Sequence, residues 1–129
     1  MPHIIVEYTS NIKSEAEIHR LLKKINLSLF SHGNLFPIGG IRTRAIELHD
    51  YVIADGSEDD AFVHITLKIG AGRTEEEKKH VCDRLFEVVK EHFRPLFKKR
   101  FIALSLELYE FSEAGTYKWN NIHTRFKNN

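Results

Sequence analysis

Pro2 follows Met1 directly and opens a near-continuous apolar run that continues to residue 8. Removal of Met1 leaves Pro2 with a free secondary amine, held by a rigid ring at the start of that run. An α-amine has a peptide pKa of about 7.7–8, much closer than that of lysine to the neutral pH at which a general base works best. Pro2 is therefore a candidate proton-transfer base. The structural alternative is that Pro2 only begins a strand, where its missing N–H costs no ladder hydrogen bond.

Three arginines, Arg42, Arg44 and Arg73, are candidates for binding an anionic substrate beside that amine. A guanidinium pairs with a carboxylate through two parallel hydrogen bonds and stays charged at any relevant pH. Arg73 precedes a predicted helix start, where the helix dipole disfavours a solvated cation and makes anion binding more attractive. Arg42 and Arg44 alternate on a predicted strand and share one face, so Arg44 is the substitute for Arg42. Burial and these like charges are expected to lower the Pro2 pKa and leave the amine neutral at pH 7.

Hydrophobic periodicity predicts the elements that carry these residues in the first half of the chain. Residues 2–8 are typical of a strand covered on both faces. A capping box over 14–17 predicts a helix start, and Gly33 is expected to cap the end of that helix in the left-handed conformation. A strand over 41–48 and a short extended piece over 51–53 follow. The apolar stripe of the helix consists of Ile18, Leu21, Leu22, Ile25 and Leu29.

The second half has the same order of elements. Residues 61–69 predict a strand, and a second capping box over 74–77 predicts a helix that ends near Pro95. Residues 101–111 predict the last strand, with Ile102, Leu104, Leu106 and Leu108 on one face. The buried stripe of this second helix is expected to consist of Val81, Leu85, Val88, Val89, Phe93 and Leu96.

A shift of sixty residues superposes the two halves as tandem β-α-β units. We therefore expect one domain over 1–129, with repeats over 2–48 and 61–111 and a C-terminal tail over 112–129. A right-handed crossover makes the two strands of each unit parallel. The expected fold is α+β, with a four-stranded sheet and two helices on one face.

The superposition also predicts one site per chain. Phe62 falls opposite Pro2, Ile102 opposite Arg42 and Lys13 opposite Arg73. In each pair only one copy has the reactive residue type: the first copy supplies Pro2 and Arg42, and the second supplies Arg73.

The face of the sheet away from the helices is expected to be apolar, lined by Leu and Ile. Such a face is usually buried against copies of the same chain, which predicts an oligomer. The tail is polar, and Trp119 and Phe126 are expected to pin it to a neighbouring surface.

Charge and composition exclude several classes of partner. The 19 basic and 18 acidic residues are well mixed, so neither nucleic acid nor an anionic membrane is an expected partner. No apolar run approaches the ~20 residues that span a bilayer, and the N-terminus lacks the basic region of a signal peptide. Cys82 is the only cysteine, which excludes an intrachain disulfide and fits a cytoplasmic location. The eight histidines lack ligand spacing, so no metal is expected.

Several motifs together resemble the tautomerase superfamily. They are Pro2 after Met1, the helix opening over 72–78 and the duplicated β-α-β unit. Within the superfamily, the stretches 36–44 and 61–73 resemble the 5-carboxymethyl-2-hydroxymuconate isomerase family. Ala54-Asp55-Gly56 and Asn120-Asn121-Ile122-His123 share this likeness.

The resemblance implies a cofactor-free enzyme that assembles as a homotrimer and acts in aromatic catabolism. It implies that Pro2 is the general base and that Arg42 and Arg73 bind a small dicarboxylate or tricarboxylate substrate, an unsaturated 2-hydroxy or 2-oxo acid. One arginine would orient a carboxylate and the other would stabilise charge on the keto-enol oxygen, with Arg73 provisionally at the keto end. Two alternatives are a decarboxylase or hydratase on the same scaffold, and a non-catalytic β-α-β ligand-binding or assembly module.

Overall fold

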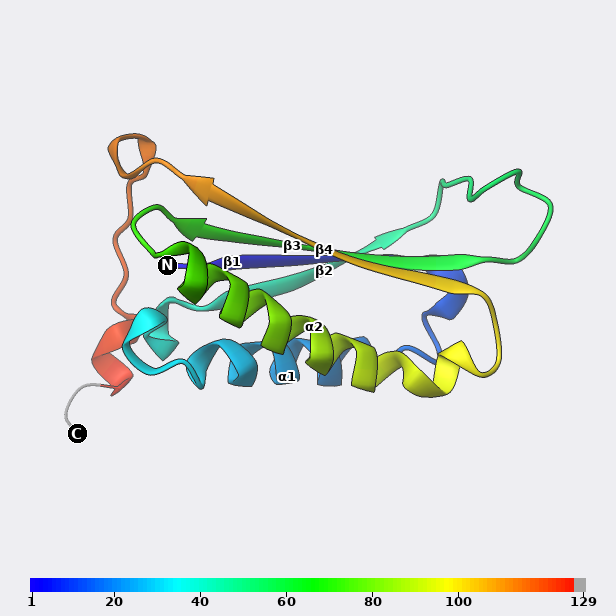
Figure 1. The fold of residues 1–129 in the computed structure, drawn as a ribbon, viewed down its shortest axis with the longest axis horizontal. Helices are drawn as coiled ribbons and strands as arrows, with labels where there is room; N and C mark the ends of the chain where they lie inside the picture. The colour runs from blue at the N-terminus through cyan, green and yellow to red at the C-terminus, as the bar shows by residue number, and fades with distance from the viewer. Residues whose placement is uncertain (127–129) are drawn as a thin grey trace.

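The structure is a computed structural model of the whole chain and describes residues 1–126. Two β-α-β units form one four-stranded sheet with strand order β2-β1-β3-β4 (Figure 1). Strands are parallel within each unit, and β1 and β3 pair antiparallel at the centre. The expected α+β architecture with two tandem units is confirmed. The elements are β1 (His3–Thr9), α1 (Ile18–Phe30), β2 (Arg42–Leu48), β3 (Ala61–Gly70), α2 (Glu75–Phe97) and β4 (Ile102–Phe111).

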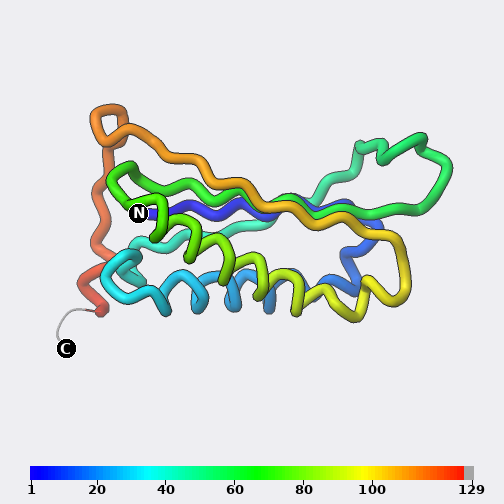
Figure 2. Tube along the Cα trace, in the orientation of Figure 1, coloured from blue at the N-terminus to red at the C-terminus, as the bar shows by residue number. Residues whose placement is uncertain are grey.

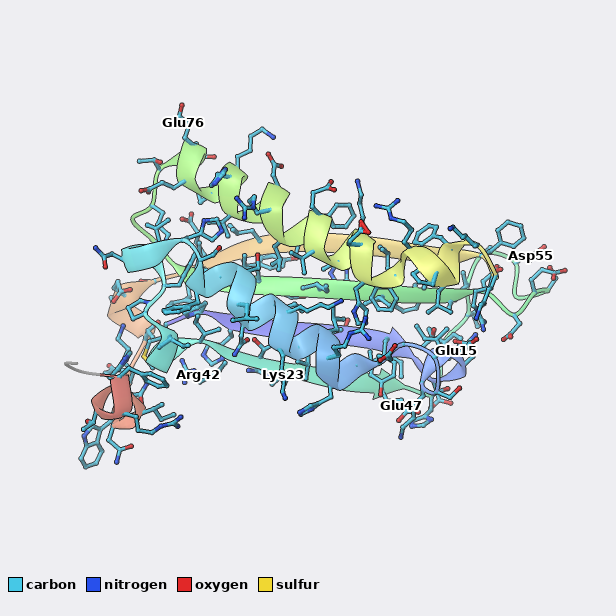
Figure 3. All side chains as sticks on the ribbon, turned by 90° about the horizontal axis from the view of Figure 1, so that it is seen from below. Glu15, Lys23, Arg42, Glu47, Asp55 and Glu76 are labelled. Atoms are coloured by element: carbon cyan, nitrogen blue, oxygen red, sulfur yellow. The ribbon has the colours of Figure 1, made fainter. Side chains whose placement is uncertain are left out.

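Both long helices cover the same face of the sheet, as the edge-on trace of Figure 2 shows. The core lies between these two layers, and each large apolar side chain buried there contributes about 1.5–3 kcal/mol. Figure 3 views the molecule from the helix side, with α1 and α2 in front of the strands. The predicted stripes supply the helix side of this core, with Leu21, Ile25, Leu29, Val81, Leu85, Val89, Phe93 and Leu96 all buried.

The two helices begin differently, although the sequence predicts a capping box for both. The box of α2 is present, because the Thr74 hydroxyl accepts from Glu77 N and the Glu77 carboxylate accepts from Thr74 N. The predicted box of α1 is wrong. Residues 14–17 form a turn in which Ala16 is buried and the N-cap Glu17 is left-handed, with φ of 46°. The carbonyl of Ala16 lies 2.7 Å from His92 Nε2, so a contact with α2 replaces the local cap.

A shift of sixty residues aligns the buried positions of the two helices. In the strands, the same shift is wrong by one residue. Arg42 pairs with His3 on the open face of the sheet, whereas Ile102 pairs with Ala61 under the helices. Because side chains alternate between faces, a slip of one residue moves a side chain to the other side. Ile102 is therefore not the structural counterpart of Arg42. Phe62 fails as the counterpart of the buried Pro2 for the same reason, since it points to the open face.

The open face of the sheet is mostly polar, which corrects the expectation of a Leu and Ile surface. The predicted row from Ile102 to Leu108 packs under the helices instead. The open face carries the polar residues His3, Glu7, Arg42, Arg44, His64, Thr66, Lys68, Ser105 and Glu107, and its apolar residues include Ile5, Ile46, Leu48, Phe62, Ala103, Tyr109 and Phe111. Residues 51–53 belong to a loop and form no strand.

The tail crosses the end of the sheet after β4, passing from η4 (Glu113–Gly115) to η5 (Ile122–Phe126) (Figure 1). Asn120 Nδ2 donates to the Gly39 carbonyl at 2.9 Å and ties the tail to η3 (Ile38–Gly40). A Cβ on Gly39 would lie 2.7 Å from His123 Nδ1, so this close approach requires glycine. Trp119 is fully exposed and Phe126 is 44% exposed, so neither is buried against the described part of this chain, and their role as anchors on a neighbouring surface stays a prediction.

Candidate active site

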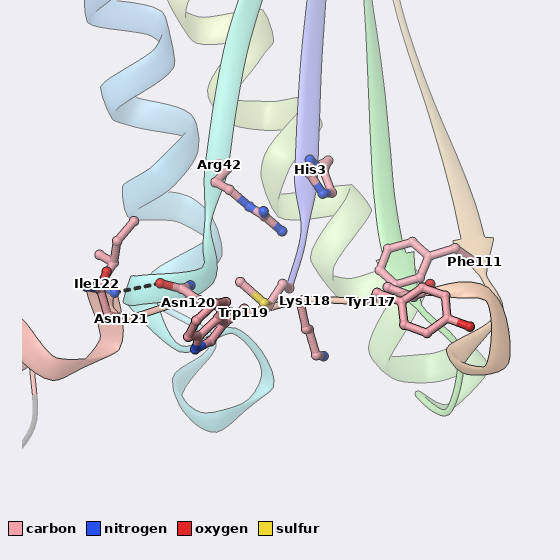
Figure 4. Close-up of a pocket in the computed structure, with 11 residues that line it drawn as sticks. His3, Arg42, Phe111, Tyr117, Lys118, Trp119, Asn120, Asn121 and Ile122 are labelled. Atoms are coloured by element: carbon pink, nitrogen blue, oxygen red, sulfur yellow. Dashed lines mark hydrogen bonds between the residues drawn. The ribbon is translucent and has the colours of Figure 1, made fainter.

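A cleft of about 350 Å³ opens at the end of the sheet where β1 and β2 begin (Figure 4). Met1 and His3 line it from the first strand, Arg42 from β2 and Phe111 from the end of β4. Tail residues 116–122 complete the lining. Parallel pairing of β1 with β2 brings the two starts together, and antiparallel pairing of β1 with β3 brings the second unit to the same end.

Arg42 is the predicted arginine that lines the cleft. Its backbone N donates to the Pro2 carbonyl at 3.2 Å, so the start of β2 is fixed beside Pro2. Its Nε is buried and has no hydrogen-bond partner within residues 1–126. A buried guanidinium N–H without an acceptor is costly, and an anion in the cleft can satisfy it.

Arg73, also predicted to bind the substrate, does not line the cleft and is held by neutral groups. Its Nη1 donates to the Gly70 carbonyl at 3.0 Å and its Nη2 to the Leu35 carbonyl at 2.6 Å. Its guanidinium also stacks on Phe36, with the ring centroid 4.6 Å from Cζ. None of these contacts neutralises the positive charge, so Arg73 is a fixed cation beside the N-terminus.

Arg44 lies two residues further along β2, exposed and outside the cleft lining. Its Nη1 is 3.1 Å from His3 Nδ1, which accepts from it in the neutral imidazole. Burial, followed by the charges of Arg42 and Arg44, lowers the pKa of His3 and favours that neutral form. The structure therefore brings Arg42 to the cleft and leaves Arg44 on the open face of the sheet.

The N-terminal amine lies in a cationic environment. Burial lowers the pKa of the Met1 α-amine, and the charges of Lys118, Arg73 and Arg42 lower it further. Glu113 acts in the opposite direction. Pro2 is buried directly behind this group, and with Met1 attached its nitrogen is an amide without basicity.

No group of three or more His, Cys, Asp or Glu side chains in the described part of the chain is placed to hold a metal ion. His64 contacts Ser105 and Glu107 across β3 and β4, away from the cleft. Cys82 packs against the core, and burial raises the pKa of its thiol. None of the helices described between residues 1 and 126 is both long and apolar enough to cross a membrane.

Sequence reasoning missed the contribution of the tail to the cleft. Lys118 belongs to no helix or strand and to none of the motifs named above, so no pattern points to it, whereas the family likeness marked Asn120 without giving its role. The Gly39-Gly40 pair was the available signal, because adjacent glycines mark a place where another segment approaches the backbone closely.

A family model described as 5-carboxymethyl-2-hydroxymuconate isomerase matches residues 2–126. The chain belongs to this family. A 5-carboxymethyl-2-hydroxymuconate Delta-isomerase of Escherichia coli is 44% identical over 127 residues, covering 98% of this chain and all of that protein. Membership confirms the predicted class of enzyme, an isomerase.

Solved structures agree with this family fold. A 5-carboxymethyl-2-hydroxymuconate isomerase from Deinococcus radiodurans R1 superposes with a TM-score of 0.93 at 52% identity, covering 98% of this chain and 95% of that one. A fused 4-OT described as a symmetric trimer superposes at 0.71 with 19% identity, covering 92% of each chain, and shares the fold. The predicted tautomerase-like architecture is confirmed by these matches.

Proposed function

We propose that this isomerase acts on 5-carboxymethyl-2-hydroxymuconate or a closely similar unsaturated 2-hydroxy acid, with Pro2 as its general base once Met1 is removed. One observation carries this proposal. The Met1 α-amine lies in a cleft where burial and the charges of Lys118, Arg73 and Arg42 lower its pKa, and the same surroundings are expected to act on the Pro2 amine once Met1 is removed. The names of the family and of its relatives supply the substrate class.

The reaction moves a proton and a double bond. A 2-hydroxymuconate is a dienol, and its keto form arises when the hydroxyl proton leaves and a carbon of the diene gains a proton. The chemical task is therefore proton removal and proton return through a dienolate. A neutral secondary amine performs both steps in turn, because its pKa lies near the working pH.

The two arginines have different roles in this mechanism. Arg42 faces the cleft with an unpaired Nε, so it binds a substrate carboxylate. Arg73 is held by two neutral carbonyls and keeps its charge, so it stabilises the negative charge of the dienolate. Its fixed position avoids reorganisation when that charge develops. The exposed Arg44 is the substitute for Arg42 if the substrate extends toward the open face.

The assembled enzyme is proposed to be a homotrimer that works in the cytoplasm in the breakdown of aromatic compounds, without a cofactor. The family resemblance and the trimer described for a protein of the same fold support this assembly. Light scattering of the purified protein tests it, and a monomer at micromolar concentration contradicts it.

The test of the proposed function compares two forms of the N-terminus. Mass spectrometry first establishes that the purified protein lacks Met1. A second form carries one extra residue before Pro2, which converts the amine to an amide and leaves the rest of the cleft in place. We expect kcat/KM on the dienol to fall by about 10²–10⁴-fold in the extended form.

The pH profile is the second measurement. In the Met-free form kcat/KM is expected to rise with pH through a midpoint below the ~7.7–8 of a peptide α-amine, because the neutral amine is the active form. Equal activity of the two N-terminal forms contradicts the role of Pro2 as the base. Lack of turnover by the Met-free form contradicts the proposed substrate.

A further inference from the structure

Lys118 is a basic side chain of the cleft that comes from the tail and not from the sheet. It lines the cleft with Arg42, and Figure 4 shows that the two residues belong to different segments, β2 and the tail. Lys118 is exposed, and no acidic side chain within residues 1–126 pairs with it through a salt bridge. Its charge is therefore available to a ligand.

The tail is anchored on both sides of Lys118. Before it, Thr116 Oγ1 donates to the Ser112 carbonyl at 2.6 Å, and the Ser112 hydroxyl accepts from Ala114 N at 3.2 Å. After it, Asn120 Nδ2 donates to the Gly39 carbonyl at 2.9 Å. Lys118 is two residues from each anchor, so its backbone is held at the cleft while its side chain stays free to move.

The charge balance of the cleft favours a ligand with several carboxylates. Arg42 and Lys118 line it, and Arg73 lies outside the lining but near enough for its charge to act on the N-terminal group. The N-terminal group experiences the charges of all three, and Glu113 is the carboxylate that opposes them. The proposed substrate has three carboxylates, two from muconate and one from the carboxymethyl arm.

We propose that Lys118 binds the carboxylate of the carboxymethyl arm and sets the preference of the enzyme for a tricarboxylate over a dicarboxylate substrate. This inference rests on the proposed function. A carboxymethyl arm rotates about single bonds and presents its carboxylate in several directions. A lysine ammonium on a flexible side chain can move with such a carboxylate. A guanidinium is less suitable, because its two parallel hydrogen bonds require a carboxylate in a fixed orientation. Arg42, fixed at the start of β2, suits a carboxylate that is conjugated with the diene.

The test measures the activity of each enzyme variant on two substrates. Wild type, Lys118→Ala and Lys118→Arg, all free of Met1, are assayed on 5-carboxymethyl-2-hydroxymuconate and on 2-hydroxymuconate, which lacks only the carboxymethyl arm. Lys23→Ala is the matched control, because Lys23 is an exposed lysine of α1 outside the cleft. We expect Lys118→Ala to lower the tricarboxylate-to-dicarboxylate ratio of kcat/KM by about three- to tenfold. Lys118→Arg is expected to keep most of this ratio, and Lys23→Ala all of it.

Two results overturn the assignment. A Lys118→Ala enzyme with an unchanged ratio shows that Lys118 does not contact the arm. An equal loss on both substrates shows that Lys118 acts on the amine or on a carboxylate common to both.

Failure of the proposed function is recognised separately, because wild type then isomerises neither dienol. Calorimetric binding of propane-1,2,3-tricarboxylate and of glutarate then tests Lys118. Weaker tricarboxylate binding by Lys118→Ala with unchanged glutarate binding supports the assignment, and equal changes for both ligands overturn it.

Discussion

The arginines at the two ends of the sheet have different partners. At the end where β3 begins, Arg100 Nη2 donates to Asp59 O at 2.6 Å and pairs with Asp59 Oδ2 at 3.2 Å. Asn11 Nδ2 donates to the same aspartate at 2.9 Å, and Lys13 pairs with Glu47 at 3.0 Å. At the end where β1 begins, Arg42 has no acidic partner within residues 1–126, and Arg73 contacts only neutral carbonyls and an aromatic ring.

This difference distinguishes an end whose cations are paired, here called the structural end, from the end that we propose to be reactive, here called the reactive end. A cation that is paired within the chain stabilises the fold, and little of its charge and few of its hydrogen-bond donors are available to a ligand. A cation left unpaired beside a buried amine lowers the pKa of that amine and attracts carboxylates. The tandem units thus supply two comparable ends, and the placement of acidic residues makes only one of them suitable for anion chemistry.

The largest expected contrast comes from removing one arginine at each end. Arg42→Ala is expected to lower kcat/KM by about 10²–10³-fold, because a carboxylate partner in the cleft is lost. Its free energy of unfolding should change little, since Arg42 makes no side-chain hydrogen bond or salt bridge in the described residues. Steady-state kinetics and urea unfolding measure the two quantities. A larger kinetic loss in Arg44→Ala than in Arg42→Ala would transfer the role to Arg44.

The matched change at the other end is expected to lower stability and to leave activity unchanged. Arg100→Ala removes the contacts with Asp59 and is expected to lower the free energy of unfolding by about 1 kcal/mol, since Asp59 is largely exposed and solvent weakens the pair. Its kcat/KM is expected to stay at the wild-type value. Loss of activity without loss of stability in this variant would contradict the division into a structural and a reactive end.

A smaller effect is expected from loosening the tail at the reactive end. Gly39→Ala places a Cβ 2.7 Å from His123 Nδ1 and 2.9 Å from His123 Cα, so the tail has to shift. Overpacking of this kind costs about 1–3 kcal/mol, and we expect it to appear as faster proteolysis of the tail and as a higher KM. Gly115→Ala is the control, because an added Cβ there meets no atom within 4 Å. Identical proteolysis of the two variants contradicts docking of the tail on Gly39.

The smallest expected effect concerns pH and His92, which lies beside the start of α1. Burial lowers the pKa of His92, and its Nε2 lies 2.7 Å from the Ala16 carbonyl. The folded state therefore binds fewer protons than the unfolded state, and stability is expected to fall as the pH drops below the unfolded value of about 6.5. His92→Gln should flatten this dependence in urea unfolding measured between pH 7 and pH 5. A profile as steep as that of wild type would assign the dependence to His3 or His32, whose pKa values are also lowered.

The sequence predicted the sheet, the helices and the residues around Pro2 because strong local signals mark them. Apolar stripes at helical spacing and the Thr74 capping box depend on neighbouring residues alone. The box predicted over 14–17 was wrong because a tertiary contact, Ala16 with His92, overrode a local preference. The alignment of the two units paired strand residues that lie on opposite faces of the sheet. Side chains in a strand alternate between faces, so an error of one residue in the alignment reverses the face, and sequence similarity alone does not reveal such an error.

The candidate site was predicted in part for the same reason. Arg42 is carried by a strand whose register places it in the cleft. Arg73 was expected to face the substrate, and only coordinates reveal that two carbonyls hold it outside the cleft lining. Lys118 could not be predicted, because its position depends on the docking of an irregular tail on a glycine pair 81 residues from Asn120.

That distant docking divides the chain into two parts with different roles. All four strands and both long helices end by Phe111, so the sheet and its helical layer lie wholly before the tail. The cleft is complete only with Asn120 docked on Gly39. A protease that removes the tail is therefore expected to leave the sheet and helices in place while it opens one side of the cleft.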